Sequence, residues 1–266
     1  MTLCAIDART PALAAEALQR SMQQADFARV LLFTHGPFTA PAGIEVVDAG
    51  PIRSGAEYSH FVLRRLPAHV PAGHVLVTQW DGFVVDASAW SDDFLQWDYI
   101  GAVWDDQPAA TCVGNGGFSL RSQRLLQAGL DARIVQEHPE DAMLARTYRT
   151  LLEGTHGVRF APPAVARRFA FENEAPAGAT FGFHGPKNLP AVLDAPTLRR
   201  WLAALPDDFF RGRDARRLAR ALLARRMPAV ARQLLARRRA AGRNDFNTWM
   251  LDLAAQLSRP FGKEPT

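Results

Sequence analysis

The stretch V-L-V-T-Q-W-D-G, residues 75–82, indicates the fold class. It is an apolar run of strand length that ends on an acid and a glycine, which predicts a buried strand carrying the carboxylate of Asp81 to the edge of a sheet. Two further segments follow, F-L-Q-W-D-Y-I-G-A-V-W at residues 94–104 and V-G-N-G-G-F-S-L-R-S at residues 113–122. Glycines around an asparagine let backbone approach a ligand closely, although they also serve plain turns.

Strand-like and helix-like segments alternate through the first two thirds of the chain. Apolar runs and helical spacing predict strands at residues 2–6, 30–34, 44–47, 75–78, 99–103 and 158–161, and helices at 11–24, 57–66, 124–128 and 142–152. Thr10 is expected to cap the first helix, with Pro11 at its first position, and Ser122 to cap the helix at 124–128. This alternation favours an α/β fold with a mostly parallel sheet covered on both faces.

Two acids follow predicted strands directly. Asp7 and Asp81 are therefore expected at the carboxyl edge of the sheet, where ligands bind in such folds. The alternative for Asp7 is a solvated turn acid, and for Asp81 with Gly82 it is an ordinary strand-to-turn signal.

Three later features bear on chemistry. The glycines at 114, 116 and 117 precede a strand rather than a helix, which argues against a phosphate-binding loop and favours a carbohydrate pocket. Glu140 and Asp141 open a predicted helix, either as acids that suit its dipole or as a general base at the sheet edge. His184 lies between glycines and is followed by Lys187, and an imidazole nitrogen there suits a metal ion such as manganese.

Length and composition limit the possible domain organisation and cellular compartment. The chain has 266 residues, of which 48% are hydrophobic, enough for one large α/β domain with a decorated terminus or for two small domains. Cys4 and Cys112 match no zinc or disulfide pattern, which favours a reducing compartment. Neither a signal peptide nor a membrane-spanning run is recognisable, so we expect a cytoplasmic protein that is soluble or at most peripheral.

The charge is divided unevenly. Residues 197–266 carry 16 Lys+Arg against 6 Asp+Glu, whereas the rest of the chain carries 15 against 21. Helical spacing with arginines on the polar faces predicts helices at residues 197–204, 214–224, 228–240 and 245–257. Such faces are either merely solvated or bind an anionic membrane or an anionic acceptor. Nucleic acid is disfavoured because no recognised nucleic-acid module accompanies the arginines.

At this point the motifs support a family resemblance. Q-W-D-G, F-L-Q-W-D-Y-I-G-A-V-W, V-G-N-G-G-F-S-L-R-S, P-E-D-A and F-G-F-H-G occur in an order and spacing that resemble a bacterial family catalogued as a domain of unknown function, DUF5672. Its members resemble glycosyltransferases of the GT-A type. The match covers residues 58–188, with looser agreement over 2–33. The resemblance implies a GT-A-like domain at residues 1–194, followed by an Arg-rich helical extension at 195–266.

The resemblance also implies roles for individual residues. Gln79-Trp80-Asp81 occupies the place of the Asp-x-Asp motif, which holds a divalent ion (Mn²⁺ or Mg²⁺) on the diphosphate of a nucleotide sugar, with Gln79 replacing the first acid. His184 matches the histidine that completes the metal site. Asp141, beside Glu140, matches the usual base. The remaining residues assigned to the donor are Asp7, Asn115, Gly116, Gly117 and Lys187.

These implications lead to one main functional hypothesis. It is a glycosyltransferase of polysaccharide biosynthesis that moves a sugar from a nucleotide-diphosphate donor, such as a UDP-sugar, to a glycan or lipid-linked acceptor, either in the cytoplasm or at the inner face of a membrane. The replacement of an acid by Gln79 leaves open whether a metal is required, and whether the anomeric configuration is inverted or retained also stays open. The alternatives are a non-catalytic protein of the same fold that binds a glycan or nucleotide, and a nucleic-acid-binding adaptor that acts through the basic tail.

Overall fold

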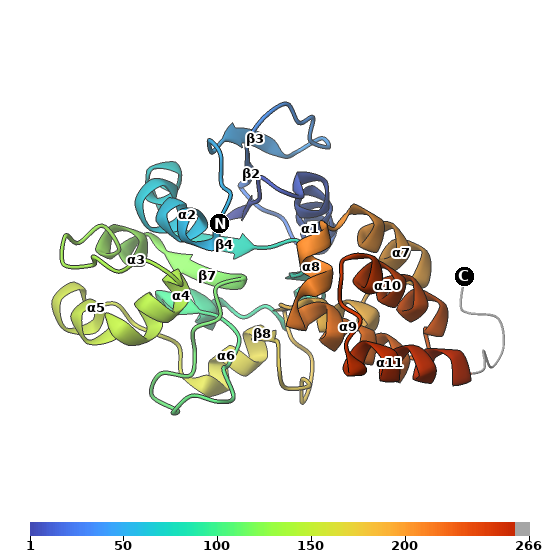
Figure 1. The fold of residues 1–266 in the computed structure, drawn as a ribbon. Coiled ribbons are helices and arrows are strands. Elements are labelled where there is room, and N and C mark those ends of the chain that lie inside the picture. The colour runs from blue at the N-terminus through green and yellow to red at the C-terminus, as the bar shows by residue number, and fades with distance from the viewer. Residues whose placement is uncertain (259–266) are drawn as a thin grey trace. The chain divides into compact units, whose positions relative to one another are not determined.

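The computed structural model describes residues 1–258, and the chain forms two compact units, Met1–His184 and Gly185–Thr266 (Figure 1). The boundary expected after residue 194 falls inside the second unit. Each unit is described by itself below.

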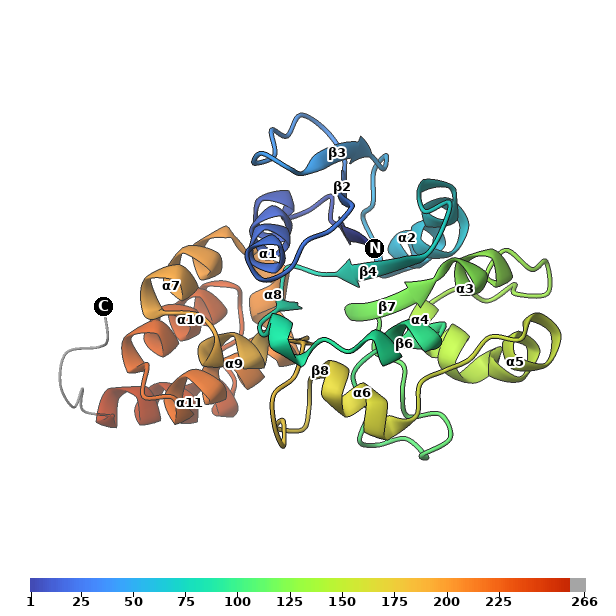
Figure 2. The same cartoon turned by 180° about the vertical axis from the view of Figure 1, so that it is seen from behind.

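A six-stranded sheet forms the centre of the first unit (Figure 2). Its strands, in spatial order, are β3 (Glu45–Asp48), β2 (Arg29–Thr34), β1 (Thr2–Ile6), β4 (His74–Thr78), β7 (Phe118–Ser122) and β6 (Tyr99–Ile100). Strands β1 to β4 pair in parallel, and β7 is antiparallel to both of its neighbours. The prediction of a mixed, mostly parallel sheet is confirmed.

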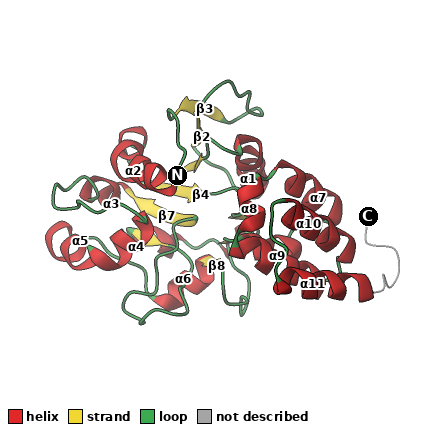
Figure 3. Ribbon diagram, viewed as in Figure 1, coloured by secondary structure: helices red, strands yellow, loops and turns green. Residues whose placement is uncertain are grey.

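Both faces of this sheet are buried, which explains why its strands are continuous apolar runs. Successive side chains of a strand point to opposite faces. In β1, Leu3 and Ala5 pack in one core with residues of α1 (Pro11–Gln24) and α6 (Pro163–Phe169), whereas Cys4 and Ile6 pack in another with Phe61 and Leu126. The predicted covering of the sheet on both faces is therefore confirmed (Figure 3).

The remaining helical segments of the first unit are short. They are the α-helices α2 (Gly55–His60), α3 (Gln123–Ala128), α4 (Glu140–Ala142) and α5 (Arg149–His156), the π-helical turns Phe61–Arg65 and Met143–Thr147, and the 3₁₀ turns Leu66–His69, Ala87–Ala89 and Asp92–Gln96. Ser122 caps α3 as predicted, because its side chain accepts a hydrogen bond from the backbone N–H of Leu125. The helices predicted at residues 57–66 and 142–152 are each broken by a π-helical turn.

The strand predicted at residues 158–161 is wrong. Only Phe160 forms an isolated bridge, with Tyr99. The reason is a competing contact, because the backbone N–H of Arg159 donates to the Asp98 carboxylate at 2.8 Å and its carbonyl accepts from Asp98 N at 2.7 Å. Strand β6 ends at Ile100 rather than at residue 103, and Val103 forms only an isolated antiparallel bridge with Val113.

A second sheet of three two-residue strands lies in the same unit. Its order is β5 (Phe83–Val84), β9 (Gly182–Phe183) and β8 (Ala170–Phe171). Strand β9 is antiparallel to β5 and parallel to β8. This small sheet joins segments that are about one hundred residues apart in the sequence, and it sets the geometry of the site described below.

The second unit is helical. A 3₁₀ segment (Pro186–Ala191) precedes α7 (Ala195–Ala204), α8 (Asp207–Arg211), α9 (Arg213–Ala224), α10 (Pro228–Ala240) and α11 (Phe246–Leu257). The four predicted helices are confirmed to within a few residues, and α8 is an addition. Arg238 is buried, with hydrogen bonds to Thr248 Oγ1 at 2.8 Å and to the carbonyl of Phe210 at 2.7 Å. Among residues 1–258, no helix combines the length and the apolar character that a membrane span needs.

Candidate functional site

The Q-W-D-G stretch turns sharply at the carboxyl end of β4. The backbone N–H of Gly82 donates to the carbonyl of Gln79 at 3.1 Å, which closes the turn, and the hydroxyl of Thr78 donates to the carbonyl of Gly82 at 2.5 Å. Asp81 is buried at 6% exposure, and its Oδ1 makes no hydrogen bond of normal geometry within residues 1–258. A buried carboxylate is costly unless a positive charge lies near it. For Asp81 that charge is the imidazole of His184, whose Nε2 is 3.4 Å from Oδ1.

Strand registers bring two other segments to this turn. Because β7 is antiparallel to β4 and Thr78 pairs with Phe118, residues 114–117 lie beside the carboxyl end of β4. Because Phe83 pairs with Phe183, the residue that follows β9 lies beside Gly82. A side chain at Gly82 would approach the carbonyl of Phe183 to 2.7 Å, so this closeness depends on glycine. The three motifs therefore meet at one edge of the sheet.

His184 lies between two carboxylates. Its Nε2 is 3.4 Å from Asp81 Oδ1 and 3.2 Å from Gln79 Oε1, and its Nδ1 is 3.5 Å from Glu172 Oε1. Burial alone lowers the pKa of His184, but the charges of Asp81 and Glu172 outweigh it and raise the pKa to about 10. At neutral pH the imidazole is therefore a cation held by Asp81 and Glu172.

Asn115 and Gly117 border the group formed by Asp81, His184 and Glu172. Asn115 donates from Nδ2 to Glu172 Oε2 at 2.9 Å and accepts the backbone N–H of Gly117 at 3.1 Å. A Cβ at Gly117 would be 2.0 Å from His184 Nε2. The glycine is thus needed because the imidazole packs directly against the backbone, which agrees with the close approach that the sequence indicated.

Asp141 lies on the other side of the glycine loop. Its Oδ2 accepts the backbone N–H of Gly116 at 3.1 Å, and its Oδ1 accepts that of Ala142 at 2.7 Å. The pKa of Asp141 is raised, chiefly by burial and then by the charge of Glu140, while the two backbone donors oppose the shift. A carboxylate with a raised pKa beside a polar loop is suited to accept a proton.

Glu140 is held differently from Asp141. It is buried, and its Oε1 accepts a hydrogen bond from Arg121 Nη2 at 2.8 Å. Arg121 is fully buried and also donates from Nε to Ser119 Oγ at 2.9 Å. Burial lowers the pKa of Arg121, but Tyr99 and Glu140 raise it more, so the guanidinium stays charged. Glu140 and Arg121 thus form a buried ion pair beneath the loop that carries Gly116.

Sequence reasoning missed Arg121 and Glu172. Arg121 belongs to the quoted N-G-G-F-S-L-R block, and an arginine in an otherwise apolar strand was the available signal. Glu172 directly follows β8, whose register with β9 places it beside His184. A two-residue strand leaves almost no pattern in the sequence, so this partner was not predictable.

Two predicted donor-binding residues have other surroundings. The carboxylate of Asp7 accepts the backbone N–H groups of Arg9 at 2.7 Å and Thr10 at 2.6 Å, and the hydroxyl of Thr10 at 2.6 Å. These contacts are those of a turn acid at the start of α1, the alternative weighed for Asp7. Lys187 belongs to the second unit. A role in donor binding stays a prediction for both residues.

Comparison with known proteins places the chain in a family. The family model described as "Protein of unknown function (DUF5672)" matches residues 42–184, more than half of the chain. The chain belongs to the DUF5672 family. The matched region includes Gln79, Asp81, Asn115, Asp141 and His184, whereas the candidate residues Asp7 and Lys187 lie outside it.

Two further comparisons complete this picture. Among solved structures, the galactosyltransferase LgtC in complex with donor and acceptor sugar analogues matches at 11% sequence identity and a TM-score of 0.43, covering 69% of this chain and 86% of that chain. This similarity is too weak to assign a role to the DUF5672 chain. The comparison with curated proteins found no match.

The side chains of the site can be tested against the expected divalent metal. Within residues 1–258 no group of three histidine, cysteine or acidic side chains is arranged to hold a metal ion. The donor types nevertheless fit, because carboxylate oxygen, amide oxygen and imidazole nitrogen all suit Mn²⁺, and Oδ1 of Asp81 makes no hydrogen bond beyond its ion pair with His184. To act as a ligand, His184 would have to lose the proton on Nε2, the nitrogen that faces Asp81, and could keep the proton on Nδ1 toward Glu172.

Proposed function

We propose that this protein transfers a sugar from a nucleotide-diphosphate donor to a hydroxyl group of a glycan or lipid-linked acceptor. The observation that supports the proposal best is the meeting of Asp81, His184 and Gly117 at the carboxyl end of β4. Ligands of open α/β sheets bind at this edge. The site offers a buried carboxylate, an imidazole beside it and a glycine loop, and a diphosphate sugar requires groups of these kinds.

The proposed mechanism assigns the leaving group to Asp81, Gln79 and His184. Asp81, with His184 and Gln79, would hold a divalent metal, which would supply positive charge for the departing diphosphate. His184 keeps its orientation because Glu172 holds its Nδ1, in the way that second-sphere carboxylates orient metal-binding histidines. Lys187 is a proposed point charge for the same phosphates.

Asp141 is the proposed general base. Its carboxylate removes the proton from the attacking acceptor hydroxyl, which suits its raised pKa, and an inverting displacement follows. Gly116 and Asn115 border the donor sugar in this proposal. Glu140, expected from the sequence as a second catalytic acid, is instead assigned a positioning role, because its charge is already committed to Arg121.

Nucleotide binding tests the proposal. We would measure heat of binding for uridine, guanosine, cytidine and thymidine diphosphates with Mn²⁺ or Mg²⁺, in wild type, in Asp81→Asn and in the control Asp92→Asn, an exposed acid of a 3₁₀ turn. We expect one nucleotide to bind the wild type and the control but not Asp81→Asn. Absence of binding to the wild type, or equal binding to Asp81→Asn, would refute the proposal.

A non-catalytic binding protein of the same fold is the second candidate. Gln79 in place of the first acid favours it, because an amide contributes less to a metal site than a carboxylate does. Hydrolysis of the matching nucleotide sugar separates the two candidates. Slow metal-dependent release of the sugar supports the transferase, whereas tight binding without release supports the binding protein.

The second unit has a surface suited to an anionic membrane. Phe246, Trp249 and Leu257 of α11 are exposed at 72%, 59% and 73%, and their spacing places them along one side of the helix together with Met250. Exposed aromatic and aliphatic side chains on a strongly basic unit favour a peripheral position on anionic lipid, the cytoplasmic face being the expected place.

Vesicle binding tests this membrane role. We expect the protein to sediment with vesicles of phosphatidylglycerol but not of phosphatidylcholine, and to lose that binding in Phe246→Ser with Trp249→Ser. Equal vesicle binding by the wild type and the double variant would contradict the membrane role. Binding to oligonucleotides instead of vesicles, with a steep salt dependence, would also contradict it.

A further inference from the structure

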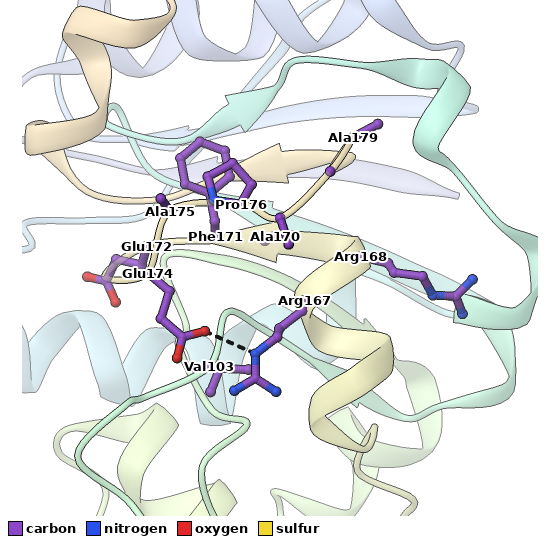
Figure 4. A pocket seen from close by; sticks show the side chains of 12 residues that line it. Val103, Arg167, Arg168, Ala170, Phe171, Glu172, Glu174, Ala175, Pro176 and Ala179 are labelled. Carbon is purple, nitrogen blue, oxygen red and sulfur yellow. Dashed lines mark hydrogen bonds and ion pairs between the residues drawn. The ribbon is translucent and has the colours of Figure 1, made fainter. Parts of the chain in front are cut away.

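A cavity of about 430 Å³ lies between β8 and the loop of residues 172–180 (Figure 4). It is lined by one residue of the 101–113 segment, by the end of α6, by β8 and by the loop, namely Val103, Arg167, Arg168, Ala170, Phe171, Glu172, Glu174, Ala175, Pro176, Ala177, Gly178 and Ala179. Pockets of roughly 300–1,000 Å³ are typical for small molecules. Apart from Glu172, none of these residues enters the mechanism above.

The lining carries two carboxylates and two guanidiniums. Glu172 and Glu174 both line the cavity, and Arg167 Nε is 3.0 Å from Glu174 Oε2. Figure 4 shows Arg168 directed away from the other lining side chains, and its guanidinium lies over the ring of Phe94 at 5.8 Å. The formal charges of the lining therefore balance, which suits a neutral ligand. The carboxylates of Glu172 and Glu174 can accept hydrogen bonds from its hydroxyl groups.

The rest of the lining is apolar. Phe171, Pro176 and four alanines offer carbon surface, and the ring of Phe171 is fixed because it stacks on Phe183 at 5.8 Å. A ligand with apolar C–H faces and several hydroxyl groups matches a wall of this kind facing two carboxylates. We infer that this cavity binds a neutral sugar residue.

Glu172 connects the cavity with the candidate site. The side chain lines the cavity, while Oε2 accepts from Asn115 at 2.9 Å and Oε1 is 3.5 Å from His184 Nδ1. A sugar hydroxyl on Glu172 is therefore one side chain away from the pair of His184 and Asp81. As a substrate pocket, the cavity rests on the proposed function, and its sugar is either the acceptor residue or the sugar of the donor.

Blocking the cavity from its exposed loop tests the inference. Ala177 is exposed and lines the cavity, so Ala177→Trp is chosen to block it, and Ala164→Trp, at an exposed position of α6 outside the lining, is the matched control. Binding of the methyl glycosides of glucose, galactose, mannose and N-acetylglucosamine is measured by saturation-transfer NMR. We expect at least one glycoside to bind the wild type and Ala164→Trp but not Ala177→Trp, and to bind Glu174→Gln more weakly.

Two results would overturn the sugar pocket. One is that no glycoside binds the wild type, and the other is that Ala177→Trp binds as the wild type does. Neither depends on nucleotide binding, so the glycosyltransferase proposal, tested with Asp81→Asn, stands or fails separately.

The source of the sugar follows from a second arm with uridine diphosphate and Mn²⁺ present. A glycoside that stays bound beside the nucleotide identifies the acceptor side. A preference for UDP-glucose over uridine diphosphate that disappears in Ala177→Trp identifies the donor sugar. Both outcomes support a sugar in the cavity.

Discussion

Loss of the Glu140 charge should destabilise the first unit strongly, because it leaves Arg121 as an unpaired charge in the interior. Arg121 is fully buried, and Glu140 is the carboxylate that its guanidinium contacts, at 2.8 Å. Removing one partner of a buried ion pair costs about 3–5 kcal/mol. Glu140→Gln retains the shape and one acceptor, so the cost measures mainly the lost charge. Arg121→Met should cost a similar amount, since it leaves the carboxylate unpaired.

The losses of unfolding free energy caused by the two substitutions should not be additive. In the double variant Arg121→Met with Glu140→Leu no buried charge remains, so we expect a smaller loss than the sum of the single losses. Hydrogen–deuterium exchange of peptides from β4 and β7 is the suitable assay, because it reports the opening free energy of the first unit alone. The exposed pair of Arg29 and Glu45 provides the control, in which Glu45→Gln should have little effect.

The reasoning fails if Glu140→Gln changes protection of β7 no more than Glu45→Gln does. It also fails if the double variant loses the full sum of the single losses, because the two charges would then act independently.

Three further predictions follow from the site and the second unit. Burial and the charge of Glu140 raise the pKa of Asp141, so kcat/KM for the matching nucleotide sugar should already fall at a pH above the usual pKa range of aspartate as the pH is lowered. Glu140→Gln should move this fall to lower pH. A pH–rate profile that does not change in Glu140→Gln would contradict the role of Asp141 as the base. Gly117→Ala should abolish nucleotide binding measured by calorimetry, because its Cβ would be 2.0 Å from His184 Nε2. The control Gly154→Ala, whose Cβ would meet nothing within 4 Å, should bind normally. Equal binding by both variants would count against the proposed site. Asp245→Ala should reduce the protection of α11 peptides against hydrogen exchange by about 1–2 kcal/mol, because the Asp245 carboxylate caps the helix by accepting the backbone N–H of Thr248 at 2.8 Å. Unchanged protection would show that this cap does not contribute to stability.

The sequence was informative where local pattern decides structure. Strands β1, β2, β3 and β4 followed from apolar runs, and helix α1 from its spacing with Pro11 at the first position. The placement of Asp81 at the sheet edge followed from the same rule, because a residue that leaves a parallel strand has to emerge at its carboxyl end.

Other parts of the site depend on long-range pairing and were out of reach. The contact of Glu172 with His184 requires the register of β8 and β9, two strands of two residues each. The strand predicted at residues 158–161 failed because the buried carboxylate of Asp98 competes for the backbone of Arg159. Short helices such as α8, with Pro206 immediately before it, are too brief for a periodic signal.

The two ends of the loop at residues 172–180 are anchored independently of its middle. Strand β8 fixes the chain just before Glu172, and β9 fixes it just after Phe181, while residues 173–179 are exposed. Exposed loops tolerate insertion and replacement far better than the elements that hold them. Replacement of this segment is therefore expected to leave His184 and Asp81 in position. If the cavity binds a sugar as inferred, loops of different length grafted between β8 and β9 would change its selectivity and retain the candidate site.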